Sequence, residues 1–137
     1  MGDIHQPLHA TSRFDATQTN GDRGGNEVKL CATPCKNELH AFWDDVLGTS
    51  TNPLTAQKAA AALPAADATL AAIALESTWI DESFNAAQNS VYILPVGVGA
   101  GPFTLDPTYK ANAKKLATER VALAGARLAN LINDALQ

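Results

Sequence analysis

The chain has 137 residues, of which 46% are hydrophobic and 18% charged, and its formal net charge is −4. This length predicts a single domain, and the composition is ordinary for a globular protein. No run of about eighteen apolar residues occurs, which excludes a transmembrane helix, and the polar residues 1–9 predict no signal peptide. The acidic balance disfavours a nucleic-acid-binding module that works through bulk electrostatics without a metal.

The first forty-odd residues contain all three histidines. His40 and Asp44 are four residues apart, so on a helix both side chains lie on one face, within reach of one ion. Two imidazoles and one carboxylate, from His9, His40 and Asp44, are ligands that zinc takes when it keeps an open position for water. Asp3 or His5 could add to the set. The spacing alone leaves two alternatives open, an ordinary contact on a helix surface and a site for iron or manganese.

Residues 10–36 are rich in Thr, Ser, Asp, Asn and Gly, and this composition predicts a long loop. Within it, Glu27–Leu30 alternates polar and apolar residues, which predicts a short extended strand. A loop of this length inside a domain is usually held by something. A metal bound by His9 before the loop and by His40 after it would hold the loop closed.

The next segment predicts a short helix that Asn37 caps and that ends at the Gly-Thr-Ser run 48–50. Its apolar stripe at helical spacing contains Leu39, Phe42, Trp43, Val46 and Leu47. His40 and Asp44 lie next to this stripe, so they would project from a packed element. Trp43 has two interpretations, a core anchor beneath the metal site or, if exposed, a platform on which a base stacks.

Abundant alanine and few aromatic residues favour packed helices over a sheet. The rest of the chain predicts four helices, over 55–63, over 66–75, from 77 or 78 to 92, and over 107–136, the last with Asp106 as N-cap and Pro107 at its first position. The third of these helices is expected to bury the face listed as Ile80, Phe84, Ala87 and Val91. The last is expected to bury the stripe Tyr109, Ala113, Leu116, Ala117, Ala124, Leu128, Leu131 and Ala135.

Three motifs, GDIHQPLH over 2–9, DRGGN over 22–26 and NELHAFWD over 37–44, resemble the signature of the S1/P1 nuclease family. Members are zinc-dependent, mostly secreted nucleases that cut single-stranded DNA and RNA, and their fold is related to bacterial zinc phospholipase C. The runs WIDES over 79–83 and LAGARLA over 123–129 also resemble the C-terminal helices of the family. The resemblance therefore covers nearly the whole chain.

The resemblance implies roles for individual residues in a cluster of three zinc ions. His9, His40 and Asp44 would form one complete site, and Asp3 would be catalytic as the bridge between the other two ions. Asn26 would lie near the substrate phosphate, although a turn residue at positive φ is an equal alternative.

Further residues would support these ligands. His5 is expected to be a supporting or core histidine, and Asp22 either hydrogen-bonds a ligand histidine or makes the turn. Glu82 is expected to be a buried supporting acid or a solvated surface residue. Because the family is secreted or periplasmic, we expect a disulfide between Cys31 and Cys35; the residues alone also allow free thiols or two further metal ligands.

The implied fold is a mainly α helical bundle of the phospholipase C/P1 nuclease type, one domain over 1–137, with a metal-binding segment over 1–48 and a helical scaffold over 54–136. The remaining zinc ligands would fall before Met1, so we expect the N-terminal half of the family domain to be absent, one zinc to bind, and a homo-oligomer to cover the open face. The implied activity is hydrolysis of phosphodiesters in single-stranded DNA or RNA to 5′-phosphate products. The alternatives are a non-catalytic, self-associating zinc-binding helical fragment and a phospholipase C-like hydrolase.

Overall fold

The computed structural model describes residues 1–32 and 37–137, and within these ranges the chain is mainly helical and has no β-strand. The mainly α fold class is thus confirmed. The α-helices are α1 (Leu39–Asp45), α2 (Pro53–Ala61), α3 (Ala68–Ala71), α4 (Glu76–Ala86) and α5 (Pro107–Ala135). Two short 3₁₀ helices, η1 (Asp3–His5) and η2 (Pro7–Ala10), precede them, and a π-helical segment, η3 (Ala87–Val91), continues α4.

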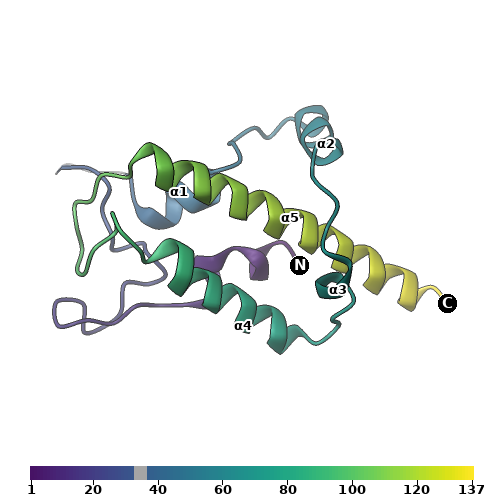
Figure 1. The fold of residues 1–137 in the computed structure, drawn as a ribbon, viewed down its shortest axis with the longest axis horizontal. Helices are drawn as coiled ribbons and strands as arrows, with labels where there is room; N and C mark the ends of the chain where they lie inside the picture. The colour runs from purple at the N-terminus through teal and green to yellow at the C-terminus, as the bar shows by residue number, and fades with distance from the viewer. Residues whose placement is uncertain (33–36) are drawn as a thin grey trace.

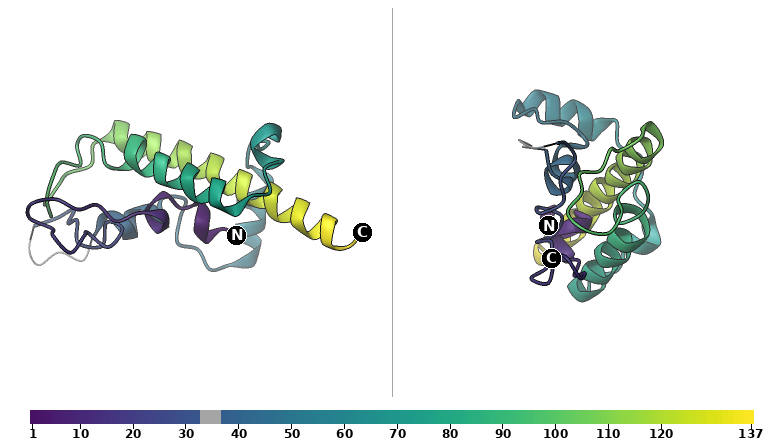
Figure 2. Two further views of the ribbon diagram at one scale, coloured as in Figure 1. Left: turned by 90° about the horizontal axis from the view of Figure 1, so that it is seen from below. Right: turned by 90° about the vertical axis from the view of Figure 1, so that its left-hand side faces the viewer.

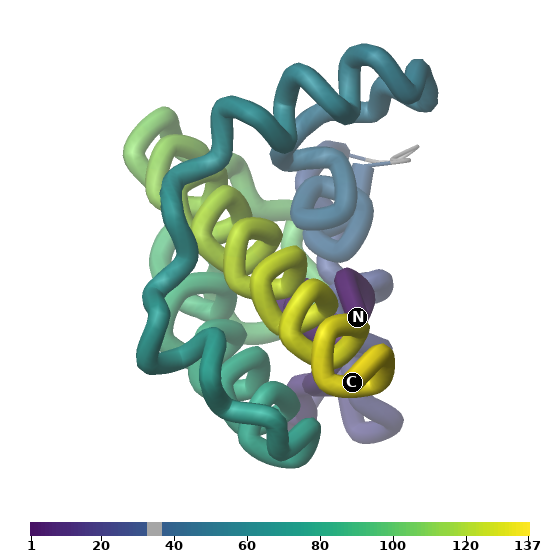
Figure 3. The backbone as a smooth tube through the Cα atoms, turned by 90° about the vertical axis from the view of Figure 1, so that its right-hand side faces the viewer, coloured from purple at the N-terminus to yellow at the C-terminus, as the bar shows by residue number. Residues whose placement is uncertain are grey.

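The long helix α5 and the helix α4 form one layer, and the first ten residues lie against both of them (Figures 1 and 2). The connection from α2 crosses α5 to reach α3, which packs on α5, while the C-terminal end of α5 projects beyond the rest (Figures 1 and 3). No helix in the described ranges combines the length and the apolar composition needed to cross a bilayer.

The core lies where η2, α1, η3 and the first half of α5 meet. Two buried hydrogen bonds at the Tyr109 hydroxyl connect its elements. The hydroxyl donates to the Val91 carbonyl at 2.8 Å and accepts from the Trp43 indole nitrogen at 3.2 Å. Burial raises the pKa of Tyr109 to about 12, so the hydroxyl keeps the proton that it donates. The buried members of the core are Leu8, Val28, Leu39, Trp43, Ala87, Val91, Val96, Leu105, Tyr109 and Ala113.

The helix ends follow local sequence signals where these are strong. Asp106 caps α5 by accepting from the Tyr109 amide at 2.7 Å, and Pro107 occupies the first turn, both as predicted. Asn52 likewise caps α2, which begins earlier than expected because Pro53 starts the helix. The cap predicted at Asn37 is wrong, because the N-cap of α1 is Glu38, without a side-chain hydrogen bond.

Two other expectations about local structure are corrected. The strand predicted over Glu27–Leu30 is not formed, since Lys29 makes only an isolated antiparallel bridge with Glu38. The second predicted helix, 66–75, shrinks to the single turn α3. The Lys29 amide instead donates to the Ala100 carbonyl of a distant loop at 2.8 Å. In the second segment, the Leu70 and Ala71 carbonyls accept from the Arg127 and Asn130 side chains of α5 at 3.0 Å.

The buried face of α4 also differs from the prediction. Trp79 and Ser83 face inward, whereas Ile80 and Phe84 are 46% and 41% exposed. Ala87 and Val91, the other two residues of the predicted face, are buried in η3 as expected. Both sets have helical spacing, so periodicity could not separate them; the hydrogen bond from Ser83 Oγ to the Ile4 carbonyl selects the polar face. The predicted stripe of α5 is corrected in its second half, where Leu128 is 45% exposed and Arg127 is buried.

The long loop is fixed to the segment that precedes α5. The Arg13 guanidinium donates to the Gly97 carbonyl at 2.8 Å and the Gly99 carbonyl at 3.0 Å, and Asp15 accepts from the Gly99 amide at 3.0 Å. Asp22, which is fully buried, accepts from the Arg13 amide at 2.9 Å. These contacts hold the glycine turn that follows Asp22 next to η2 and α1.

Candidate metal centre

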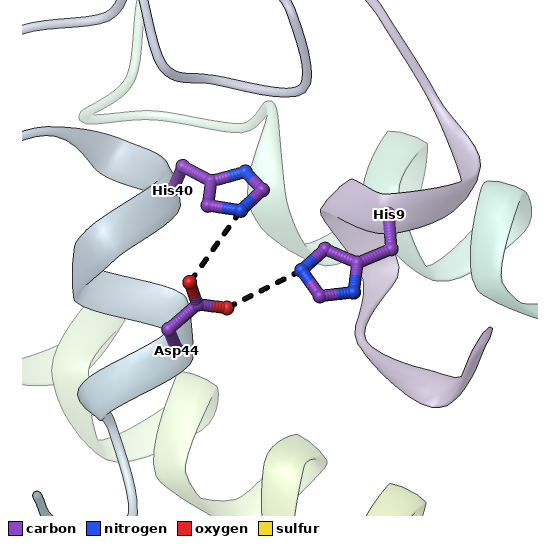
Figure 4. Close-up of side chains that lie close together, drawn as sticks. All are labelled: His9, His40 and Asp44. Carbon is purple, nitrogen blue, oxygen red and sulfur yellow. Dashed lines mark ion pairs between the residues drawn. The ribbon is translucent and has the colours of Figure 1, made fainter. Parts of the chain in front are cut away.

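His9, His40 and Asp44 come together at one surface of the fold (Figure 4). Asp44 Oδ1 lies 3.4 Å from His9 Nε2, and Asp44 Oδ2 lies 3.4 Å from His40 Nε2. One ligand atom from each residue falls within 4.8 Å of the others. The two imidazole rings are stacked at 22° with 5.0 Å between their centroids. The set therefore brings two nitrogens and a carboxylate around one point.

The ligands come from two separate elements that the core holds in place. Helix α1 carries His40 and Asp44 one turn apart and is anchored by Leu39 and Trp43, which are 0% and 2% exposed. His9 lies in η2, next to Leu8, which is 1% exposed. Because burial fixes the neighbours of each ligand, the cluster is built on rigid elements although its own side chains reach the surface.

The outer ring nitrogens of both histidines have partners. His40 Nδ1 lies 2.7 Å from the Gly24 carbonyl, and His9 Nδ1 lies 3.1 Å from the Asp3 carbonyl and 2.9 Å from Asp3 Oδ1. A carbonyl accepts but cannot donate, so each Nδ1 is assigned as a donor, and Nε2 is the ring nitrogen left facing Asp44. Metal-bound histidines are oriented in this way by a carbonyl or carboxylate behind the ring.

The carbonyl behind His40 depends on a glycine. Gly24 has a φ of +64°, and a Cβ placed on it would lie 2.5 Å from the Leu8 carbonyl oxygen. Glycine alone adopts this conformation without strain and fits this close approach. The glycine turn therefore serves the site by aiming its backbone carbonyl at the ring of His40.

The carboxylate has its own supporting contact, which the sequence did not indicate. Gln6 Nε2 donates to Asp44 Oδ1 at 2.9 Å, and the amide oxygen of the same Gln6 accepts from the Leu8 amide. Gln6 thereby links the entry of η2 to α1. Gln6 lies inside the GDIHQPLH motif, but its spacing from Asp44 gave no sign that it would bond the carboxylate.

Asp3 and His5 lie outside this three-residue cluster. The Asp3 side chain is 85% exposed and contacts the outer nitrogen of His9. His5 is buried with its ring tilted against Trp79, and its Nε2 lies 2.9 Å from Arg127 Nη1. Since a guanidinium only donates, His5 Nε2 accepts, and its Nδ1 donates to the Met1 carbonyl at 2.9 Å.

The residues of the glycine turn also stand apart from the cluster. Asn26 donates to the Arg23 carbonyl at 2.8 Å and thus closes its own turn, and within this turn the non-glycine residue at positive φ is Arg23, at 55°. Asp22 bonds Arg13 rather than a ligand histidine. Cys35 lies outside the described residues, so its disulfide with Cys31 stays a prediction.

Two hollows flank the cluster. One of about 400 Å³ lies over Asp3, His9, His40 and Arg23, and the Arg23 side chain is 75% exposed. The other, about 260 Å³, runs from Asp44 under α1 toward α5. The cluster is thus accessible to a ligand from solvent.

Two imidazoles and a carboxylate around an accessible point form a candidate metal site in a helical protein, with a donor set that suits zinc, iron or manganese. The model of the S1/P1 Nuclease family matches residues 1–137, and the chain belongs to this family. The resemblance inferred from the three motifs is confirmed.

A curated relative gives a narrower comparison. Endonuclease 3 of Arabidopsis thaliana is 43% identical over 47 residues, which are 34% of this chain and 14% of the relative. The match thus spans about a seventh of that protein's length. No solved structure matches the chain.

Proposed function

We propose that the protein acts in the zinc-dependent hydrolysis of phosphodiester bonds in single-stranded DNA or RNA, with 5′-phosphate products. The observation that carries the proposal is the cluster of His9, His40 and Asp44, whose ring nitrogens are oriented from behind. Membership of a nuclease family and the name of the Arabidopsis relative support nucleic acid as the substrate class. The secreted or periplasmic location typical of the family is proposed with it.

The residues present fit a zinc ion. His9 and His40 would bind it through Nε2 and Asp44 through a carboxylate oxygen, a nitrogen and oxygen set that suits zinc and leaves a position for water. Zinc bound there supplies a Lewis acid that lowers the pKa of water and attracts phosphate. The chain would hold the three ligands at the surface, where the ion is accessible from the hollow that Arg23 lines.

Two charged side chains extend the site toward a substrate. The Asp3 carboxylate orients His9 through one oxygen, and its 85% exposure leaves the side chain open to a second ion, as its proposed bridging role requires. Arg23 lines the same hollow, where it pairs with Glu27 at 3.4 Å and remains largely solvated. In a chain of net charge −4, this guanidinium is a local cation for the phosphate backbone.

Cleavage of a single-stranded oligonucleotide tests the proposal. The protein is supplied with zinc or with EDTA, and Asp44→Asn is compared with Asp45→Asn, because Asp45 is the neighbouring acid that lies outside the cluster. We expect cleavage with zinc in the unsubstituted protein and in Asp45→Asn, and a loss of about 100-fold in Asp44→Asn. Equal cleavage by both variants, or cleavage that persists in EDTA, would contradict the proposal.

A further inference from the structure

A polar group on α4 and α5, buried except for the partly exposed Glu82, contacts η1, the 3₁₀ helix that begins with Asp3. We call it the arginine clamp, and it consists of Glu82, Ser83, Arg120 and Arg127. Ser83 Oγ donates to the Ile4 carbonyl at 2.6 Å, and Arg120 Nε donates to the His5 carbonyl at 3.2 Å. Arg127 Nη1 donates to His5 Nε2 at 2.9 Å.

The members of the clamp bond one another, and Arg127 also donates to the Leu70 carbonyl of α3 at 3.0 Å. Glu82 accepts from Arg120 Nη1 at 2.9 Å and from Arg127 Nη1 and Nη2 at 2.8 and 2.7 Å, while Ser83 accepts from Arg120 Nη2 at 2.6 Å. Burial by itself would raise the pKa of Glu82, but the hydrogen bonds and charges of the two arginines outweigh it and lower the pKa. The network is therefore an ion triad, with one carboxylate between two guanidinium groups.

A largely buried ion triad is weak evidence for stability, because apolar side chains of similar volume often stabilise a core as well or better. What the triad does provide is a fixed geometry. Arg120 and Arg127 are 8% and 1% exposed, and each reaches from α5 both to Glu82 and to His5. Apolar side chains could fill this volume, but they could not select the position of two backbone carbonyls.

The element that the clamp grips leads directly to the metal centre. A three-residue 3₁₀ helix has almost no stability of its own, so its position must come from tertiary contacts. The first residue of η1, Asp3, holds His9 through both its carbonyl and its carboxylate. Gln6, the next residue after η1, donates to Asp44. Any shift of η1 therefore displaces the supports of two ligands.

We propose that the arginine clamp is the positioning device of the metal centre: it fixes η1 so that Asp3 and Gln6 orient His9 and Asp44 for the ion. Its members do not touch the three ligands and act only through η1. This inference rests on the proposed zinc site. It gives the two buried arginines and Glu82 a function, whereas packing alone would not require charged residues at these positions.

Two substitutions loosen the clamp in different ways. Ser83→Ala removes the hydroxyl between Arg120 and the Ile4 carbonyl. Arg120→Lys keeps a positive charge near Glu82, but an ammonium cannot span Glu82, Ser83 and the His5 carbonyl together. The matched control is Asp106→Ala, which removes the cap of the same helix α5 by a single side-chain truncation and has no contact with η1.

Hydrogen exchange in the metal-free protein gives the first measurement. The amides of His5 and Gln6 bond the carbonyls of Gly2 and Asp3 at 3.0 and 3.1 Å and report directly on η1. We expect both amides to exchange about tenfold faster in Ser83→Ala and in Arg120→Lys, and at an unchanged rate in Asp106→Ala. Unchanged exchange in both clamp variants, provided that they fold, would overturn the inference.

Zinc affinity, measured by competition with a chromophoric chelator, gives the second. We expect about tenfold weaker binding in the two clamp variants, the size of effect typical of residues that orient metal ligands, and a change below about twofold in Asp106→Ala. An equal loss in Asp106→Ala would mean that general destabilisation explains the effect, and the inference would fail. If the unsubstituted protein binds no zinc, the proposed function fails, while the exchange rates still decide whether the clamp fixes η1.

Discussion

Zinc should raise the melting temperature of this protein, and the increase should depend on one carboxylate. The ion would join His9 to helix α1 across roughly thirty residues of loop, and the Gly24 carbonyl would support His40 from behind. Because the unfolded chain does not hold these three ligands together, the free energy of binding adds to the free energy of unfolding.

The size of the effect follows from linkage. At free zinc about 100-fold above the dissociation constant, binding stabilises the folded state by about 2.7 kcal/mol. An unfolding entropy of about 2.1 cal/mol/K per residue gives roughly 290 cal/mol/K for the 137 residues, so the melting temperature should rise by about 9 °C. Asp44→Asn replaces the anionic ligand by a neutral amide, and the rise should fall below about 3 °C.

Differential scanning calorimetry with zinc and with EDTA measures the increase. Asp45→Asn is the matched control, since it makes the same chemical change one residue further along and outside the cluster. It should retain the full increase. A melting temperature that zinc leaves unchanged in the unsubstituted protein, or one that rises equally in both variants, would refute the reasoning.

Three further predictions concern residues around the site. Because the pKa of Glu82 is lowered from its ordinary value of 4.5, its ion pairs stabilise the fold fully above that pH and are lost as the pH falls through the folded-state pKa. Glu82→Gln should therefore cost about 3 kcal/mol at pH 7 and reduce the loss of stability below pH 4.5, as measured by urea unfolding from pH 3 to 7. Tyr109→Phe leaves the Trp43 N–H and the Val91 carbonyl unpaired and should cost about 1–2 kcal/mol in urea unfolding at pH 7. Arg23→Gln should weaken the binding of a non-cleavable single-stranded oligonucleotide and reduce the salt dependence of the affinity by about 0.7 in slope, as measured by fluorescence anisotropy.

Each of these predictions has a definite contrary result. If Glu82→Gln loses as much stability below pH 4.5 as the original protein, the pH dependence must come from other carboxylates. A Tyr109→Phe protein as stable as the original would mean that water satisfies the two buried groups. An unchanged salt slope in Arg23→Gln would show that this guanidinium does not meet a phosphate.

Local sequence signals were sufficient for several parts of the fold. The start of the long helix α5 was predicted correctly, because Asp106 and Pro107 determine a helix start by short-range contacts. Its C-terminal end was predicted within one residue. The pairing of His40 with Asp44 follows from the helical repeat of α1 in the same way. Such features depend on neighbours within about four residues and are visible in any window of the chain.

Other parts were decided by contacts across the chain. The inward face of α4 was predicted wrongly at Ile80 and Phe84, because the two candidate faces have the same spacing and the carbonyl of Ile4, 79 residues away, selects Ser83. Ala87 and Val91, at the end of the predicted face, are buried as expected. The burial of Arg127 was likewise unexpected, since its partners His5 and Glu82 lie on two other elements. Arginine is rarely buried unless it is paired with an acid, and no pattern along the chain indicates that a carboxylate will lie next to Arg127.

By itself the sequence determined the class of the fold, the family, and the three residues with the right donors for an ion, because these depend on residue type, short spacing and motif order. Only the tertiary structure decided what stands behind each ligand. The Gly24 carbonyl, the Asp3 carboxylate and the Gln6 amide each reach a ligand through space, since the orientation of a side chain is set by whichever polar group the folded backbone places within about 3 Å of it.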